Sequence, residues 1–303
     1  TSAVRNVGEI SNKGIEIALN LTPIRTKEVE WDLGVTFSKN WSKVNKLWNE
    51  GDKPVTEYVL KTAYSANFVA KVGEPLGIFQ VPALATVQDE NSPYYGKVIV
   101  DANGIPTTSN SEMKTIGSSA PDFNMGFNTR VSYKGFTLSA VADWRKGGYM
   151  YSYTAQLMHF VGNTTRSLFN NREPFVVPNS VIALKDGGYA ENNRPVTSDN
   201  MSSYYSDSYS DSQFENFIIP KGYVKLRELV LSYSFPKAWI SKLGIQQLDL
   251  SLIGRNLFMW TPKANNYVDP ETTTFGNDIA SELGEFAALP STRNIGGGIK
   301  VVF

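Results

Sequence analysis

Cysteine is absent from the 303-residue chain, which excludes a disulfide scaffold, thiolate metal sites and thiol chemistry. Histidine occurs once, as His159, and a single imidazole can build neither a histidine metal cluster nor a Ser-His-Asp triad. No run of consecutive apolar residues exceeds four, whereas a membrane-spanning helix needs about 20. The first residues, TSAVRNVGEI, lack the basic and apolar segments of a signal peptide. We therefore expect either that a signal peptide has been removed or that the chain begins in the middle of a larger protein.

Charge of one sign is also lacking, because Lys+Arg and Asp+Glu balance at 29 each. A balanced chain has no net field that favours nucleic acid or an anionic membrane surface. No phosphate-binding or dinucleotide glycine motif is present, since Gly296–Gly298 lie in an expected strand with no helix after it. We expect no nucleic-acid partner, no cofactor and no metal.

Alternation of apolar and polar residues is the dominant pattern. From Val29 to Ser38 the odd positions are apolar and the even positions are polar or glycine, which is typical of a strand with one face in an apolar environment. The stretch Ile15–Thr22 alternates in the same way, so Arg25–Glu28 between the two is expected to close a hairpin. Further strands are expected at about 121–133, 136–146, 222–235, 245–257 and 291–303. Their lengths of roughly 10–13 residues exceed those of ordinary strands and match strands that cross a bilayer.

The connections between these strands alternate in length. Short connections are expected at Arg25–Glu28, Lys134-Gly135 and Pro236–Gly244, and long ones at about 42–120, 149–221 and 258–290. Outer-membrane barrels have short periplasmic turns and long extracellular loops. The sequence therefore predicts an all-β fold, a transmembrane antiparallel β-barrel. Counted from the strand that begins at Val29, the sequence predicts six strands, and a pair at Asn67–Val72 and Leu76–Val81 would bring the count to about eight.

Aromatic residues make up 12% of the chain and gather near the expected strand ends. Trp and Tyr are enriched where a protein meets both surfaces of a bilayer, although aromatics also favour strands in general. The aromatic last residue, Phe303, ends an alternating stretch that we expect to be a paired strand. On the strand at 29–41, Trp31, Leu33, Val35 and Phe37 are expected to face lipid, and Asp32, Thr36 and Ser38 the lumen. Other charged strand residues are expected to face the lumen as well: Arg130, Asp143, Arg145, Glu228, Asp249, Arg255 and Lys300.

Six stretches, in order along the whole chain, resemble the last third of the barrel of the SusC/RagA class of TonB-dependent outer-membrane transporters. They are NVGEISNKGIEIAL (Asn6–Leu19), VGEPLGIF (Val72–Phe79), LRELVLSYSFPKAW (Leu226–Trp239), GRNLFMWT (Gly254–Thr261), YVDPE (Tyr267–Glu271) and LPSTRNIGGGIKVVF (Leu289–Phe303). Within them, the residues to which we assign structural roles are Gly254, Arg255, Asn256, Asp269, Pro270, Glu271, Arg293 and Phe303.

The resemblance implies that residues 1–303 are the C-terminal portion of one 22-stranded barrel domain in the outer membrane of a Gram-negative bacterium. It implies a plug domain and earlier strands that are absent from this chain, contact with TonB through that absent part, and a SusD-like surface lipoprotein as a lid. Such proteins actively import oligosaccharides or oligopeptides. Three alternatives remain open: a siderophore or cofactor receptor, a non-transporting porin or adhesin, and a secreted glycan-binding module.

Tyrosines are frequent in the expected outside loops, while positive charge is not clustered there. The stretch Met201–Phe214 is rich in Tyr, Ser and Asp, residues that form adaptable recognition surfaces. A solvated loop packed on its neighbours is the alternative interpretation. We name Tyr149, Tyr151, Tyr204, Tyr205 and Trp260 as candidate ligand-binding residues, with Tyr153, Tyr189 and Tyr209 in the same loops. Stacking rings with scattered Asp and Asn favour a glycan first and a peptide second as cargo.

Catalysis is not expected. Asp269 and Glu271 are two residues apart, so a glycosidase pair is conceivable. Pro270 between them and the family resemblance favour a structural loop instead. We assign no catalytic residue and expect no enzyme.

Overall fold

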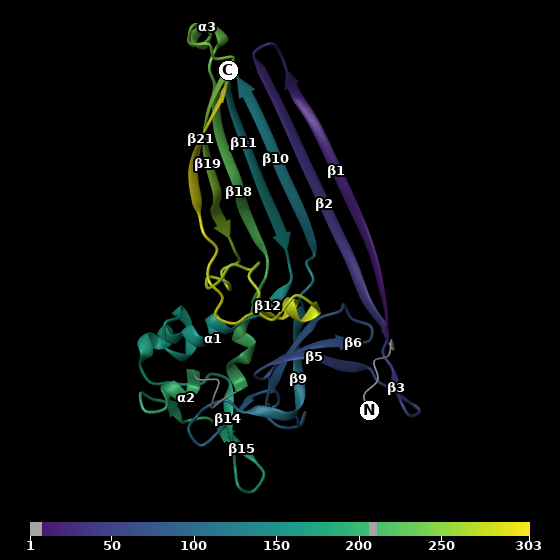
Figure 1. Ribbon diagram of the computed structural model, residues 1–303. Coiled ribbons are helices and arrows are strands. Elements are labelled where there is room, and N and C mark those ends of the chain that lie inside the picture. Colours follow the sequence, from purple (N-terminus) through teal and green to yellow (C-terminus); the bar gives the residue numbers. More distant parts are fainter. Residues whose placement is uncertain (1–7, 206–210) are drawn as a thin grey trace.

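A computed structural model describes residues 8–205 and 211–303, and its main body is one antiparallel sheet of seven strands in the order β1-β2-β10-β11-β18-β19-β21. The strands are β1 (Glu9–Arg25), β2 (Val29–Lys46), β10 (Phe123–Tyr133), β11 (Phe136–Lys146), β18 (Tyr223–Ser234), β19 (Gln247–Trp260) and β21 (Asn294–Val302). Figure 1 shows them side by side in a tall sheet, with α3 at one end and the other labelled elements gathered at the opposite end.

The register of the strands gives the sheet one apolar and one polar face. Val35 of β2 pairs with Leu19 of β1 and with Phe127 of β10, so these apolar side chains share a face. The apolar face stays open, with Leu252 58% and Ile299 74% exposed. On the other face Asp32 pairs with Arg130 and Thr36 with Gly126, while Lys300 pairs with Asp249. The predicted alternation is confirmed, and the apolar face needs an apolar surrounding because large exposed apolar patches are rare in water.

Aromatic rings contact one another at both ends of the apolar face. Near the long connections, Phe123 lies 5.7 Å from Phe37 and 4.9 Å from Trp144, measured between ring centroids. Near the short turns, Tyr233 lies 4.5 Å from Phe136 and 5.0 Å from Phe235. The two clusters lie at opposite ends of the strands, as do the aromatic belts at the two surfaces of a bilayer.

Short turns join the strands at the end of the sheet away from the other elements (Figure 1). Lys134 and Gly135 both have positive φ, 46° and 90°, the conformation of a tight two-residue hairpin turn between β10 and β11. Residues 26–28 connect β1 to β2, and the backbone N–H of Thr26 donates to the carbonyl of Val29. The third short connection contains α3 (Lys237–Ile240) and the 3-10 turn η3 (Ser241–Leu243).

The pair of short strands between β2 and β10 lies outside the main sheet. β6 (Ala66–Lys71) and β7 (Ile78–Leu84) form a separate four-stranded sheet with β5 (Glu57–Ala63) and β9 (Thr108–Ser118). The main sheet therefore has seven strands, namely the six predicted from Val29 onward and β1. Its outer strands are β1 and β21, and in the described residues no further strand pairs with the free edge of either.

Residues from all three long connections pack into a common core beyond the end of the sheet. Phe68 and Phe79 come from the first, Tyr151 and Phe214 from the second, and Leu283 from the third, and each is at most 1% exposed. No helix among the described residues is long and apolar enough to cross a membrane.

The remaining elements of this region are short. The helical segments are α1 (Tyr153–Phe160), η1 (Thr165–Arg172), α2 (Met201–Tyr205), η2 (Asp211–Phe217) and η4 (Ile279–Leu283). The strands are β3 (Asn49–Glu50), β4 (Lys53–Pro54), β8 (Val98–Val100), β12 (Tyr149–Ser152), β13 (Phe175–Val176), β14 (Ser180–Ala183), β15 (Tyr189–Glu191), β16 (Pro195–Val196), β17 (Ile218–Pro220) and β20 (Gly284–Glu285).

Candidate functional site on the polar face of the sheet

A β-bulge in β18 concentrates charge on the polar face. Lys225 pairs with Asp143 of β11, and Glu228 pairs with Val141, so Arg227 between them has no partner of its own in the register. A bulge inserts one extra residue and resets the alternation. Arg227 and Glu228 therefore both turn to the polar face, together with Lys225, while Leu226 stays on the apolar face.

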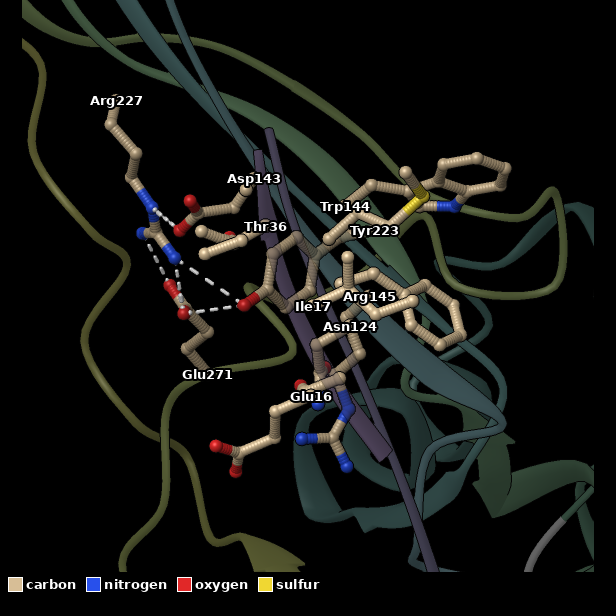
Figure 2. A pocket seen from close by; sticks show the side chains of 15 residues that line it. Glu16, Ile17, Thr36, Asn124, Asp143, Trp144, Arg145, Tyr223, Arg227 and Glu271 are labelled. Atoms are coloured by element: carbon tan, nitrogen blue, oxygen red, sulfur yellow. Dashed lines mark hydrogen bonds and ion pairs between the residues drawn. The ribbon is translucent and has the colours of Figure 1, made fainter. Parts of the chain in front are cut away.

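The cations of β18 bind the YVDPE segment of the third long connection. The Nζ of Lys225 lies 2.5 Å from Asp269 Oδ1 and 2.5 Å from Glu271 Oε2. Arg227 donates from Nη1 to Glu271 Oε2 at 2.6 Å, and its Nε lies 2.6 Å from Asp143 Oδ2. The hydroxyl of Tyr223 donates to Glu271 Oε1 at 2.7 Å. Figure 2 shows Arg227, Asp143, Tyr223 and Glu271 joined by these contacts. The network fixes the third long connection to the polar face of the seven-stranded sheet.

The electrostatics of the segment favour ionised carboxylates. Burial alone would raise the pKa of Glu271, but hydrogen bonds from Arg227, Lys225 and Tyr223 outweigh burial and lower this pKa to about 2. Burial opposes ionisation of Asp269 too, and the hydrogen bond from Lys225 is the largest of the contributions that bring its pKa below the usual range. Both carboxylates are held by cations, so neither is available as a general acid at neutral pH.

A cavity of about 530 Å³ opens beside this network on the polar face. Its lining combines charged and polar side chains of β1, β2, β10, β11 and β18 with Glu271, including Glu16, Asn124 and Arg145 (Figure 2). Arg145 donates from Nη2 to the carbonyl of Ser119 at 2.9 Å, and its buried Nε has no partner within the described part of the chain. Such a surface can bind polar groups. Across the described residues, no three His, Asp or Glu side chains are grouped as metal ligands.

The GRN residues Gly254, Arg255 and Asn256 shape a second irregularity, on β19. Asn256 has φ 51°, a left-handed conformation that Asn tolerates better than most residues, and it marks the point where β19 departs from regular pairing with β18. A Cβ on Gly254 would lie 2.8 Å from the Leu257 methyl carbons, so glycine makes room for that side chain. Arg255 donates from Nε to Glu228 Oε2 at 2.9 Å.

The predicted ligand-binding residues do not form one site. Tyr151 is 0% exposed in the core, and Tyr149 packs against Gly117. Trp260 pairs with Val224 on the apolar face and is 57% exposed, so it belongs to the aromatic cluster of that face. Tyr204 and Tyr205 line a separate cavity with His159. Tyr209 lies outside the described residues, as do Asn6 and Val7 of the first motif and positions 206–210 of the Tyr/Ser/Asp-rich stretch.

The remaining motif residues are near the network or at the chain end. Asp269 and Arg293 line a cavity of about 380 Å³ next to the YVDPE segment, and Pro270 lies between the two bound carboxylates. Phe303 follows β21 directly and is 79% exposed. Sequence reasoning missed Lys225 and Arg227 as the partners of the YVDPE segment. The adjacent charges Arg227-Glu228, in an otherwise alternating strand, were the signal of the bulge.

Comparisons with known proteins agree with this geometry. No protein-family model matches the chain. TonB-dependent receptor P3 of Formosa agariphila is 24% identical over 323 residues, which cover 100% of this chain and 30% of the relative. TonB-dependent receptor P26 of the same organism is 26% identical over 318 residues, with the same coverage. TonB-dependent receptor SusC of Bacteroides thetaiotaomicron is 25% identical over 249 residues, covering 78% of this chain and 21% of the relative.

Solved structures show the same fold. The structure of the RagAB peptide transporter matches with a TM-score of 0.60 and 18% identity, covering 98% of this chain and 30% of that one. The RagAB peptide importer in the open-open state gives 0.62 and 19%, covering 99% and 29%.

Fold and comparisons together define the class of fold: the seven-stranded sheet is part of a transmembrane antiparallel β-barrel, similar to the barrel of the RagAB structures. The resemblance to SusC/RagA-like TonB-dependent transporters, predicted from six motifs, is confirmed. The curated relatives and the solved neighbours are named as receptors or transporters, in agreement with the expectation that the chain is no enzyme. The chain spans 30% of the length of the first two relatives.

Proposed function

We propose that the protein containing this chain is an outer-membrane active importer of oligosaccharides or oligopeptides, energised through TonB. The observation that carries the proposal is the two-faced sheet, apolar outside and charged inside, in a chain that matches TonB-dependent receptors along its whole length. The charged inner face fits a water-filled or plugged lumen, and the apolar face fits lipid. On this proposal the outer membrane of a Gram-negative cell is the location.

The long connections form the extracellular side in this proposal, at about 42–120, 149–221 and 258–290. They fold into one packed region at the end of the sheet opposite the short turns, which suits a platform for a SusD-like lipoprotein lid and for cargo (Figure 1). The plug and the TonB-contacting segment would come from the part of the protein outside this chain. RagAB is named as a peptide transporter, which supports an oligomeric cargo without deciding between peptide and glycan.

The test uses the intact gene in its host, with deletions of the transporter, of the neighbouring lipoprotein and of TonB. Uptake of defined glycans, peptides and ferric chelates is measured in each strain. We expect oligomer uptake to disappear without the transporter or TonB and to fall without the lipoprotein. Uptake restricted to ferric chelates would establish the siderophore-receptor alternative. Uptake that persists without TonB would establish a passive porin.

A further inference from the structure

A second cavity, of about 530 Å³, lies in the packed region formed by the long connections. Four aromatic rings line it, from Phe169, Phe175, Tyr204 and Tyr205, and five aliphatic or proline residues complete its apolar walls. A cavity of this size is typical of small-ligand sites. Its other lining side chains are polar, namely His159, Arg166, Ser212, Gln213 and Asn216, and no Asp or Glu is among the described residues that line it.

His159 presents an unsatisfied polar atom to this cavity. The side chain is 1% exposed, its ring lies 5.1 Å from that of Tyr205, and its Nδ1 is 3.4 Å from Thr164 Oγ1. Its Nε2 makes no hydrogen bond of normal geometry in the part of the chain that the structure describes. Burial, aided by the nearby charge of Arg166, outweighs a weak hydrogen-bonding contribution from Gln213 and lowers the pKa of His159 to about 4, so the imidazole is neutral at pH 7. A buried polar atom left without a partner is costly, and a ligand can supply the missing hydrogen bond.

Arg166 supplies a positive charge at the same cavity. Its Nη1 donates to Asn216 Oδ1 at 2.5 Å, and the Asn216 amide donates in turn to Gln213 Oε1 at 2.8 Å. The hydroxyl of Tyr205 donates to the Arg166 carbonyl at 3.2 Å. The guanidinium is therefore held in place by neutral groups, and within the described side chains no carboxylate forms an ion pair with it. Arginine binds carboxylates in two-point geometry, and the remaining N–H groups suit an incoming anion.

The side chains that line the cavity favour some ligands over others. A sugar residue presents several hydroxyl donors and needs free acceptors around it. The described lining has no carboxylate, and the amide oxygens of Asn216 and Gln213 already accept hydrogen bonds from Arg166 and Asn216. Apolar and aromatic walls with one fixed cation instead fit an apolar side chain that carries a carboxylate nearby. We propose that this cavity binds the carboxyl-terminal residue of a peptide, with its carboxylate on Arg166 and its apolar or aromatic side chain among the four rings. The inference rests on the proposed function for its cargo and narrows that cargo to peptides with a free C-terminus.

The test measures binding of a fluorescent peptide ending in Phe to the purified full-length protein in detergent. The same peptide with a C-terminal amide is the comparison ligand. We expect the free acid to bind at least about tenfold more tightly than the amide, since a hydrogen bond to a charged group is worth that much. Arg166→Gln should remove this preference. Lys185→Gln should preserve it, because Lys185 is an exposed cation on the β14–β15 turn outside the cavity.

A second variant separates binding from folding. His159→Phe keeps a ring in the core while it removes the polar atom, and it should weaken both peptides without lowering the thermal stability of the protein. Equal affinity for acid and amide in the unmutated protein would overturn the inference, as would displacement of the peptide by an oligouronate through Arg166. If the purified protein prefers the free acid and Arg166→Gln removes that preference, but cells show no TonB-dependent peptide uptake, the proposed function is contradicted and the cavity assignment stands. Peptide uptake without any acid preference would contradict the cavity assignment alone.

Discussion

Arg227 and Glu271 meet through both ends of their planar groups, Nη1 with Oε2 at 2.6 Å and Nη2 with Oε1 at 2.5 Å, although 44 residues separate them in the chain. This two-point ion pair joins a strand of the barrel wall to the third long connection. Lys225 adds a more deeply buried contact to the same segment, since its side chain is 6% and that of Asp269 4% exposed. The wall and the loop therefore behave as one structural unit.

Removal of the buried cation should loosen this unit. Lys225→Met keeps the length of the side chain but leaves Asp269 without its cation, and an uncompensated buried charge costs about 3–5 kcal/mol. We expect a lower thermal-unfolding midpoint of the full-length protein in detergent and faster protease cleavage within residues 258–290. Glu228→Gln is the matched control, because it breaks the Arg255 pair on the same face, where the Arg255 side chain is 63% exposed. Exposed pairs contribute about 0–1 kcal/mol, so an equal effect of both variants would show that the buried Lys225–Asp269 pair does not hold the loop to the sheet.

Acid should release the same loop through Glu271. The pKa of this carboxyl is lowered from 4.5 to about 2 in the folded protein, so the unfolded state binds the proton more readily. The contribution of Glu271 to stability is then fully present above pH 4.5 and is lost as the pH falls toward 2. Hydrogen exchange of residues 258–290 reports it: Glu271→Gln should exchange faster than the unmutated protein at pH 7 and equally at pH 2. If the difference in exchange rate between Glu271→Gln and the unmutated protein is the same at pH 7 and pH 2, protonation of Glu271 does not control the stability of this loop.

Lipid contact of the apolar face predicts different tolerance of charge at neighbouring positions. Leu33 pairs with Leu21 and Thr129 on the apolar face, whereas Thr36 pairs with Gly126 on the polar face. Arginine on the lipid side of a barrel costs about 2–4 kcal/mol near the midplane. Leu33→Arg should sharply reduce the heat-modifiable form of the full-length protein in outer-membrane fractions, and Thr36→Arg should leave it largely intact. Equal tolerance of both substitutions would remove the membrane interpretation of this face.

The left-handed residue of β19 gives a test of backbone strain. Asn256 has φ 51°, where a β-branched side chain is strained by roughly 1–2 kcal/mol. Asn256→Val should therefore lower the unfolding midpoint, while Asn256→Gly should be tolerated because glycine adopts this conformation readily. Both variants lose the 3.3 Å hydrogen bond from the Asn256 amide to the Thr292 carbonyl. The difference between their unfolding midpoints therefore reports the cost of the left-handed backbone conformation.

The sequence predicted the barrel strands well because their alternation is a local property. The alternating residues of each strand show which of its faces is apolar, as in Val29–Ser38. The register between neighbouring strands then places the apolar faces on the same side of the sheet. The tight turn at Lys134-Gly135 was equally local. The number of strands was harder to predict, because the short strands at 66–84 have ordinary apolar patterns and belong to a different sheet.

The sites depend on contacts between distant segments, which a single sequence does not encode. Nothing near Asp269 indicates that its cation is Lys225, since the pairing requires the bulge at Arg227 and the return of the third connection to the wall. Tyr149 and Tyr151 were poor guides to a ligand site for a related reason. Tyr149 and Tyr151 are in a loop by sequence, but that loop folds into a core, where Tyr151 is fully buried.

The open edges of the sheet lead to a prediction about the 303-residue chain by itself. β1 and β21 each present one edge with no partner strand among the described residues. In hydrocarbon, each unpaired backbone group costs several kcal/mol, so two free edges oppose stable insertion. We expect the isolated chain to aggregate or remain unfolded in detergent, whereas the full-length protein should migrate as a heat-modifiable monomer. A protease-resistant, heat-modifiable monomer formed from residues 1–303 would show that β1 and β21 pair with each other, and the sheet would then be a small closed barrel.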